Sequence, residues 1–143
     1  MEIVTNTEKL RKATQSVKEA DDINQCVDEL LQGLKKYKNA VGLSANEIGY
    51  NYSIFVMKMV TGPPICVVNP VITKVRGSEV REESCLSIPG VKVKVKRPRQ
   101  IVVKGVNRYF KPVKYKLSNF RARIACHEID HLFGKLITDY KEE

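Results

Sequence analysis

The only two histidines of this 143-residue chain stand four positions apart, in the run His127-Glu128-Ile129-Asp130-His131. Positions four apart lie about 40° from each other around an α-helix, so a helix would place both imidazoles on one face. The run matches the pattern H-E-x-x-H, in which two imidazoles hold one metal ion and the glutamate takes a proton from water. The alternative is two unrelated histidines with an acidic neighbour, which the rarity of histidine in this chain disfavours.

A metal held by two histidines needs a third protein ligand. Only twelve residues follow His131, so we expect an upstream ligand rather than an acidic residue near the carboxyl end. Cysteine thiolate binds zinc and ferrous iron strongly. Three of the four cysteines look structural. Cys26 lies on an apolar helix face, Cys66 lies in a buried strand, and Cys126 points away from His127 on the same helix. Cys85 lies in a polar, turn-rich stretch where a thiol would be accessible.

The spacing of apolar residues predicts helices at both ends of the chain. A long helix is expected from Asp21 to about Lys38, and a shorter helical turn near Thr7–Ala13. A last helix, which carries the histidines, is expected from Ser118 or Asn119 to about Phe133. Gly134 is placed to end it in a left-handed conformation.

Strands are predicted between these helices by β-branched residues that Gly or Pro interrupts, at residues 52–60, 65–68, 71–75, 91–95, 101–106 and 113–117. Strict alternation of valine and lysine from Val91 to Lys96 predicts one buried and one wet face. The predicted class is α+β, with largely antiparallel sheets packed around the late helix.

The length, the cysteine spacing and the net charge limit the functions that this chain can have. A single domain over residues 1–143 is expected, because no repeat or linker divides the chain. The four cysteines form no C-x-x-C pair, and there is no signal peptide or membrane-spanning run, so we expect reduced thiols and a cytoplasmic protein. The net charge of +9 suits solvated strand faces or a polyanion. An alternative function is therefore a basic ribosome-binding or RNA-binding module, with a structural zinc site closed by Cys66 or Cys126.

Three motifs, in order, resemble those of the peptide deformylase family across nearly the whole chain. The first family motif, G-x-G-x-A-A-x-Q followed by Gly, appears as AVGLSANEIG at residues 40–49. The second, E-G-C-L-S, appears as Glu83-Ser84-Cys85-Leu86-Ser87, and the third is the H-E-x-x-H run. The short carboxyl end resembles compact members such as those in phage genomes.

The resemblance implies hydrolytic removal of the formyl group from formyl-methionine at the amino terminus of nascent polypeptides, releasing formate. Fe(II) would be held by Cys85, His127 and His131, with Zn(II), Ni(II) or Co(II) able to replace it. Glu128 would carry the proton, and the Leu86 backbone N–H would donate to the developing oxyanion.

The resemblance also implies a peptide-binding site. Extended substrate would add a strand along Val41, Gly42, Leu43 and Ser44. Ser84 replaces a glycine beside the metal-binding cysteine and adds a hydroxyl contact. The methionine pocket would be lined by Val41 and Ile124, with Phe120 and Ile88 as further candidates. Glu83 and Arg97 would orient a metal ligand, unless they form an ordinary surface pair.

Glu47 is the main departure, because the family pattern has glutamine there. A glutamine amide donates a hydrogen bond to the oxyanion, whereas an ionised carboxylate only accepts, and losing one such donor costs about 10²- to 10³-fold in rate. Three hypotheses follow: Glu47 is protonated near the metal, the site is slow, or the chain binds formylated ends with little turnover. Bacterial members of the family continue into a longer helix that docks on the ribosome, and from the short carboxyl end we do not expect that docking mode here. Ribosome contact would then use the basic surface, and we expect no membrane or specific DNA partner.

Overall fold

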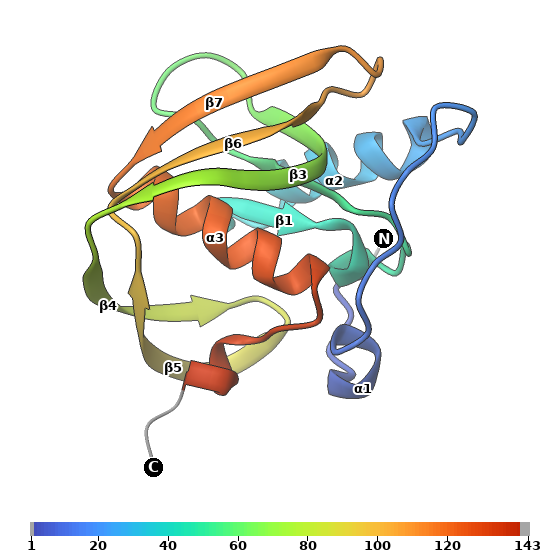
Figure 1. Cartoon of the computed structure of the whole chain (residues 1–143). Helices are drawn as coiled ribbons and strands as arrows, with labels where there is room; N and C mark the ends of the chain where they lie inside the picture. Colours follow the sequence, from blue (N-terminus) through green and yellow to red (C-terminus); the bar gives the residue numbers. More distant parts are fainter. Residues whose placement is uncertain (1, 141–143) are drawn as a thin grey trace.

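The computed structural model describes residues 2–140 and contains two antiparallel sheets with a long helix between them (Figure 1). The larger sheet has the order β1-β2-β3-β6-β7, and β4 pairs with β5 in the smaller one. The elements are α1 (Thr7–Leu10), α2 (Asn24–Lys36), β1 (Gly42–Ser44), η1 (Ala45–Ile48), β2 (Ile54–Met57), β3 (Ile65–Arg76), β4 (Glu79–Cys85), β5 (Ile88–Arg97), β6 (Gln100–Val106), β7 (Pro112–Ser118), α3 (Phe120–Leu132) and η2 (Ile137–Tyr140). The predicted α+β class and the late helix are confirmed.

The first long helix, α2, covers β1 and β2 with the apolar face that its sequence predicts. Cys26, Val27, Leu30 and Leu34 are buried there. The helix begins three residues later than expected, because the carboxylate of Asp22 accepts the backbone N–H of Asn24 at 3.2 Å and so closes a turn before it.

Strand β3 is continuous where two strands were predicted. Asn69 interrupts the pattern with a left-handed φ of 54°, and the register with β6 shifts between Val68 and Val71. The Asn69 side chain accepts the N–H of Val17 and donates to its carbonyl, both at 2.8 Å. These bonds pair the side chain of the bulge residue Asn69 with the backbone of Val17, and they attach the amino-terminal segment to the sheet.

The β4–β5 hairpin brings Cys85 to the centre of the molecule. Val93 and Val95 are buried against Ile137, while the lysines between them are exposed, as the alternation predicts. Strand β4 is strongly charged and was not predicted; it forms through its register with β5, which runs from Glu79 opposite Arg97 to Cys85 opposite Ile88.

Helix α3 is buried along most of its length, so its polar residues face the interior. It ends as predicted: Gly134 has a φ of 77°, its N–H donates to the carbonyl of His131, and the N–H of Lys135 donates to that of Asp130. Phe120 was expected on the apolar face but is 54% exposed at the other end. In the part of the chain that the structure describes, no helix has the length and apolar character of a membrane span.

We predict that Gly134→Ala destabilises the protein more than Gly62→Ala does. Both glycines have a left-handed φ, which costs an alanine about 1–2 kcal/mol. Only at Gly134 would the new Cβ collide with the backbone of Arg11, whereas Gly62 faces open space. Urea unfolding should give the larger loss for Gly134→Ala; equal losses would mean that the contact with Arg11 imposes no constraint on the end of α3.

Candidate metal centre

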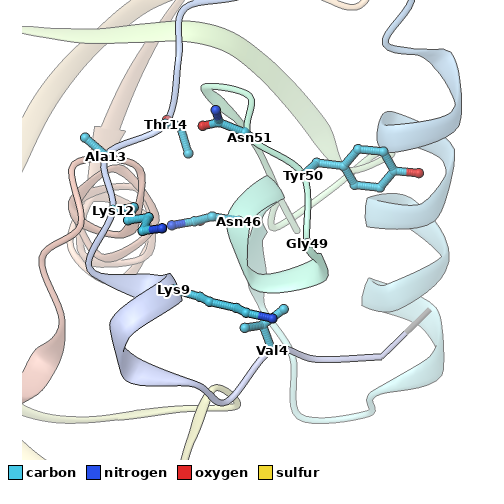
Figure 2. Close-up of a pocket in the computed structure, with 9 residues that line it drawn as sticks. All are labelled: Val4, Lys9, Lys12, Ala13, Thr14, Asn46, Gly49, Tyr50 and Asn51. Carbon is cyan, nitrogen blue, oxygen red and sulfur yellow. The ribbon is translucent and has the colours of Figure 1, made fainter.

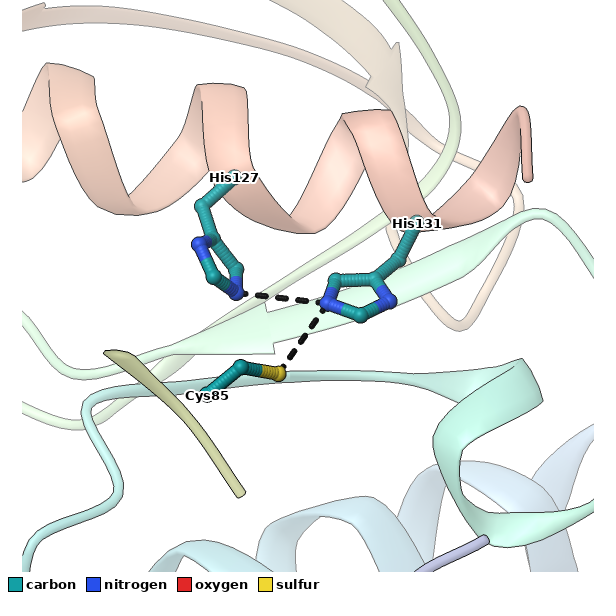
Figure 3. A group of neighbouring side chains, drawn as sticks. All are labelled: Cys85, His127 and His131. Carbon is teal, nitrogen blue, oxygen red and sulfur yellow. Dashed lines mark hydrogen bonds between the residues drawn. The ribbon is translucent and has the colours of Figure 1, made fainter. Parts of the chain in front are cut away.

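Three metal-binding atoms meet inside the molecule, from the two histidines of α3 and the cysteine at the end of β4 (Figure 3). The Nε2 atoms of His127 and His131 are 3.2 Å apart, and Cys85 Sγ is 3.2 Å from His131 Nε2. In a tetrahedral zinc or iron site such atoms are separated by about 3.3–3.6 Å, given bonds of about 2.0–2.3 Å. The donor set and spacing therefore fit a divalent cation.

The carboxyl-terminal half of α3 is anchored from the amino-terminal side of the chain. The amide of Asn46 donates to the carbonyl of His131 at 2.6 Å, and the hydroxyl of Thr14 donates to that of Leu132 at 3.0 Å. These bonds satisfy carbonyls at the helix end and fix the position of His131.

His127 is oriented by Glu83, as the second motif implied. Its Nδ1 donates to Glu83 Oε1 at 2.9 Å, so its Nε2 presents a lone pair to the cluster. Arg97 binds both oxygens of Glu83, at 3.0 and 2.9 Å. Both partners of this pair are buried, so the alternative of a surface pair is wrong.

Arg123 and Asp130 complete this network, and the sequence analysis missed both. Arg123 donates to Glu83 Oε2 at 2.6 Å and to the carbonyl of Val95 at 2.9 Å. Asp130 accepts from Arg97 and from the hydroxyl of Tyr140. An arginine within the buried part of a helix was the available signal, but its partner lies forty residues away in the sequence. Burial raises the pKa of Glu83, but hydrogen bonds from His127 and Arg97 outweigh it and lower the pKa to about 2.

Glu128 lies beside the cluster in the position of a proton acceptor. It is 4% exposed, and its Oε1 has no hydrogen-bond partner among residues 2–140. Burial and then the neighbouring charge of Glu47 raise its pKa well above the usual value. A carboxyl group with a raised pKa can exchange a proton near neutral pH.

Glu47 accepts hydrogen bonds from the protein. Its Oε1 accepts from the N–H and the hydroxyl of Ser44, at 3.1 and 2.9 Å, and its Oε2 accepts from the hydroxyl of Ser87 at 2.6 Å. Burial raises its pKa, but the charge of His131 and the hydrogen bonds from Glu128 and Ser87 lower it to about 2. The contacts therefore favour an ionised Glu47 over the protonated form among the three hypotheses.

A cavity of about 470 Å³ opens onto the cluster between β1, the β4–β5 hairpin and α3. Its walls include most of the expected site residues, namely Val41, Gly42, Glu47, Glu83, Ser84, Cys85, Leu86, Phe120, Ile124, His127 and Glu128. Ile88, Arg97 and His131 do not line it. The side chains of Leu43 and Ser44 do not line it either, because both are fully buried and that of Ser44 holds Glu47.

Gly42 places the edge strand β1 directly over α3. A Cβ at this position would lie 2.7 Å from Cγ2 of Ile124 and 2.8 Å from Oε2 of Glu128. Only glycine therefore lets the strand approach the helix closely enough to bring the cavity wall against Glu128.

A second cavity, of about 280 Å³, lies between the amino-terminal segment and the residues of and after η1 (Figure 2). Lys9, Lys12, Asn46 and Tyr50 help to line it, and it contains none of the expected site residues. Asn46 stands between the two regions, since its amide reaches the backbone of His131.

Comparisons with known proteins agree with this architecture. The sequence model of the family described as polypeptide deformylase matches residues 1–143. A protein named peptide deformylase 2 from Clostridium acetobutylicum is 37% identical over 142 residues, which cover 98% of this chain and 93% of the relative. The crystal structure of a peptide deformylase from Legionella pneumophila has a TM-score of 0.91 at 30% identity, covering 99% of this chain and 85% of that one. The crystal structure of PDF from the Vibrio parahaemolyticus bacteriophage VP16T, in complex with actinonin, has a TM-score of 0.88 at 30% identity, covering 96% and 100%.

We predict that Glu83→Gln destabilises the protein by about 3–5 kcal/mol, because the buried Arg123 loses its carboxylate partner and Arg97 is left with Asp130 alone. Because the pKa of Glu83 is lowered in the folded protein, its carboxylate adds stability above about pH 4.5, and this stability is lost as the pH falls toward 2. The variant lacks this carboxylate, so it should lose less stability than the parent over that interval. Urea unfolding at several pH values measures both effects. Glu82→Gln, on the exposed side of the same strand, is the control and should change stability by less than about 0.5 kcal/mol. Equal behaviour of the two variants would contradict the role of Glu83.

Proposed function

The chain belongs to the peptide deformylase family, and from this we propose how its own residues carry out the reaction. It is a metal-dependent hydrolase that removes the N-formyl group from formyl-methionine at the amino terminus of nascent polypeptides and releases formate. One observation supports the assignment of roles: the cluster of Cys85, His127 and His131 lies beside the buried carboxyl of Glu128. A structural zinc site is disfavoured, because neither Cys66 nor Cys126 joins that cluster.

Cys85, His127 and His131 would hold the metal ion. We propose Fe(II) as the native ion, with Zn(II), Ni(II) or Co(II) able to replace it, since a thiolate and two imidazoles suit all four. When bound there, the ion supplies a Lewis acid for the formyl carbonyl and for water. Burial and then the carboxylates of Glu47 and Glu128 raise the pKa of the Cys85 thiol, so its deprotonation would accompany metal binding.

Glu128 is the proton carrier in this mechanism. The attacking water gives a proton to Oε1, which is buried and free of other partners, as the water oxygen bonds to the formyl carbon. The proton then passes to the methionine nitrogen while the bond between carbon and nitrogen breaks. The products are formate and a free amino terminus.

The oxyanion would be stabilised by a backbone donor. Leu86 follows the metal-binding cysteine and lines the cavity, and we assign this role to its N–H. Glu47 does not share the role, because an ionised carboxylate has no proton to donate. Its function is considered separately below.

The peptide would bind along the free edge of β1. This strand lies at the edge of the larger sheet and, among residues 2–140, pairs only with β2, so its other edge can accept an extended chain. Backbone hydrogen bonds from Val41–Ser44 read no side chains, which suits an enzyme that accepts many sequences. The methionine side chain would enter the cavity near Val41, Ile124 and Ser84, with Phe120 at its exposed rim.

The basic surface would contact the ribosome in a bacterial-type cytoplasm, where formylated chains are made. Supporting this, lysines are exposed along two sheets, on β5 (Lys92, Lys94 and Lys96) and on β6 and β7 (Lys104, Lys114 and Lys116). The net charge of +9 favours a polyanionic partner such as ribosomal RNA.

We predict that protein purified anaerobically with Fe(II) releases formate from formyl-Met-Ala-Ser, and that Glu128→Gln lowers kcat by at least about 100-fold because the proton carrier is lost. Glu19→Gln, an exposed change of the same kind, should leave the rate unchanged. Circular dichroism checks that each variant is folded. Formate release that persists in Glu128→Gln would refute the role of Glu128, and a parent that binds metal but releases no formate would refute the proposed roles as a whole.

A further inference from the structure

Glu47 is a buried carboxyl group with no lysine or arginine beside it in the part of the chain that the structure describes. It is 2% exposed, and among residues 2–140 no lysine or arginine lies within ion-pair distance of it. Its nearest basic group is His131 Nε2, at 4.0 Å. Buried charges in proteins are paired or bind metal ions, because an isolated one costs too much to desolvate. A bound metal ion would supply the cationic partner that the side chains around Glu47 do not provide.

The Oε2 side of this carboxylate faces the metal-binding cluster. Glu47 Oε2 is 3.5 Å from Cys85 Sγ and 4.0 Å from His131 Nε2. Ligand atoms of one tetrahedral ion are separated by about 3.3–3.6 Å. A shift of about half an ångström would thus place Oε2 in contact with the ion that Cys85 and His131 hold.

Hydrogen bonds aim the carboxylate at this position. Ser44 holds Oε1, and Ser87, two residues after the cysteine ligand, holds Oε2 at 2.6 Å. On the side of the cluster Oε2 accepts from the Cys85 thiol at 3.5 Å, so its second lone pair becomes available when that thiol is deprotonated. A glutamine with its oxygen on Ser44 would turn its NH₂ group toward Ser87 and the cluster, and would offer no lone pair there.

We propose that Glu47 is a fourth protein ligand of the metal ion, through Oε2. The inference rests on the proposed metal centre and adds a residue to it. With one thiolate and one carboxylate, the two protein charges balance a divalent cation, whereas a glutamine at this position leaves one positive charge. The cavity that Glu47 lines also reaches Cys85, His127 and Glu128, and zinc sites can expand to five ligands, so substrate retains access.

Metal affinity tests the proposal without using activity. Zn(II) is titrated against a chromophoric chelator with the full-length parent and with Glu47→Gln, Glu47→Asp and Glu82→Gln. We expect Glu47→Gln to bind Zn(II) at least about tenfold more weakly. Glu47→Asp keeps the charge but withdraws the oxygen by one methylene, so it should also bind more weakly. Glu82→Gln removes an exposed charge from the same cavity wall and should bind like the parent.

The Co(II)-substituted proteins give a second readout. The visible spectrum should differ between the parent and Glu47→Gln, because one ligand changes, and should be the same in Glu82→Gln. Azide should alter the Co(II) spectrum of Glu47→Gln at lower concentration than that of the parent, because the variant has an open position and an extra positive charge. Circular dichroism verifies folding of each variant.

The outcomes separate this inference from the proposed function. The role of Glu47 would be overturned if the parent and Glu47→Gln had equal Zn(II) affinity and equal Co(II) spectra. If His131→Ala then lost both the Zn(II) binding and the Co(II) spectrum, the metal centre itself would stand. The role of Glu47 as a ligand would also be overturned if Glu47→Gln bound Zn(II) more weakly while Glu47→Asp bound it as tightly as the parent. A negative charge near the ion, without a bond to it, would then explain the affinity. A parent that binds no metal would overturn both.

Discussion

The buried carboxylate of Glu83 is the contact on which the arrangement of the site depends. It lies on β4, binds Arg97 of β5, and binds Arg123 and His127 of α3, so one side chain fastens the small sheet to the metal-binding helix. The hairpin of β4 and β5 carries Cys85, and the helix carries both histidines. Because three cationic or polar donors share one acceptor group, the geometry of the cluster is fixed before any ion binds.

The second constraint is electrostatic. Cys85, Glu47 and Glu128 crowd three acidic groups into a buried volume, where burial and then repulsion from the neighbouring carboxylates raise the pKa of the Cys85 thiol and of the Glu128 carboxyl. A divalent cation relieves this repulsion, and the proton displaced from the thiol links metal binding to pH. The same crowding raises the proton affinity of Glu128, the group to which we assign proton transfer.

Much of the site follows from local sequence, and the rest depends on contacts between distant residues. The spacing of His127 and His131 sets their geometry within one helix. The polar setting of Cys85 and the second family motif predict it as the third ligand, and the structure places its thiol beside both histidines. Arg123 and Ser87 act through partners forty residues away, which no local pattern encodes. Strand β4 was missed because it is charged and forms only through β5, and the Asn69 bulge made β3 look like two strands.

The central claim is that Cys85, His127 and His131 hold one metal ion next to Glu128. Diffraction data from crystals of the Fe(II)-loaded protein, collected on both sides of the iron absorption edge, test it most directly. The account predicts one anomalous peak within bonding distance of Cys85 Sγ and of the Nε2 atoms of both histidines, about 2.0–2.3 Å away. Iron bound at any other place, or a cluster that stays empty in protein shown to contain iron, would contradict it.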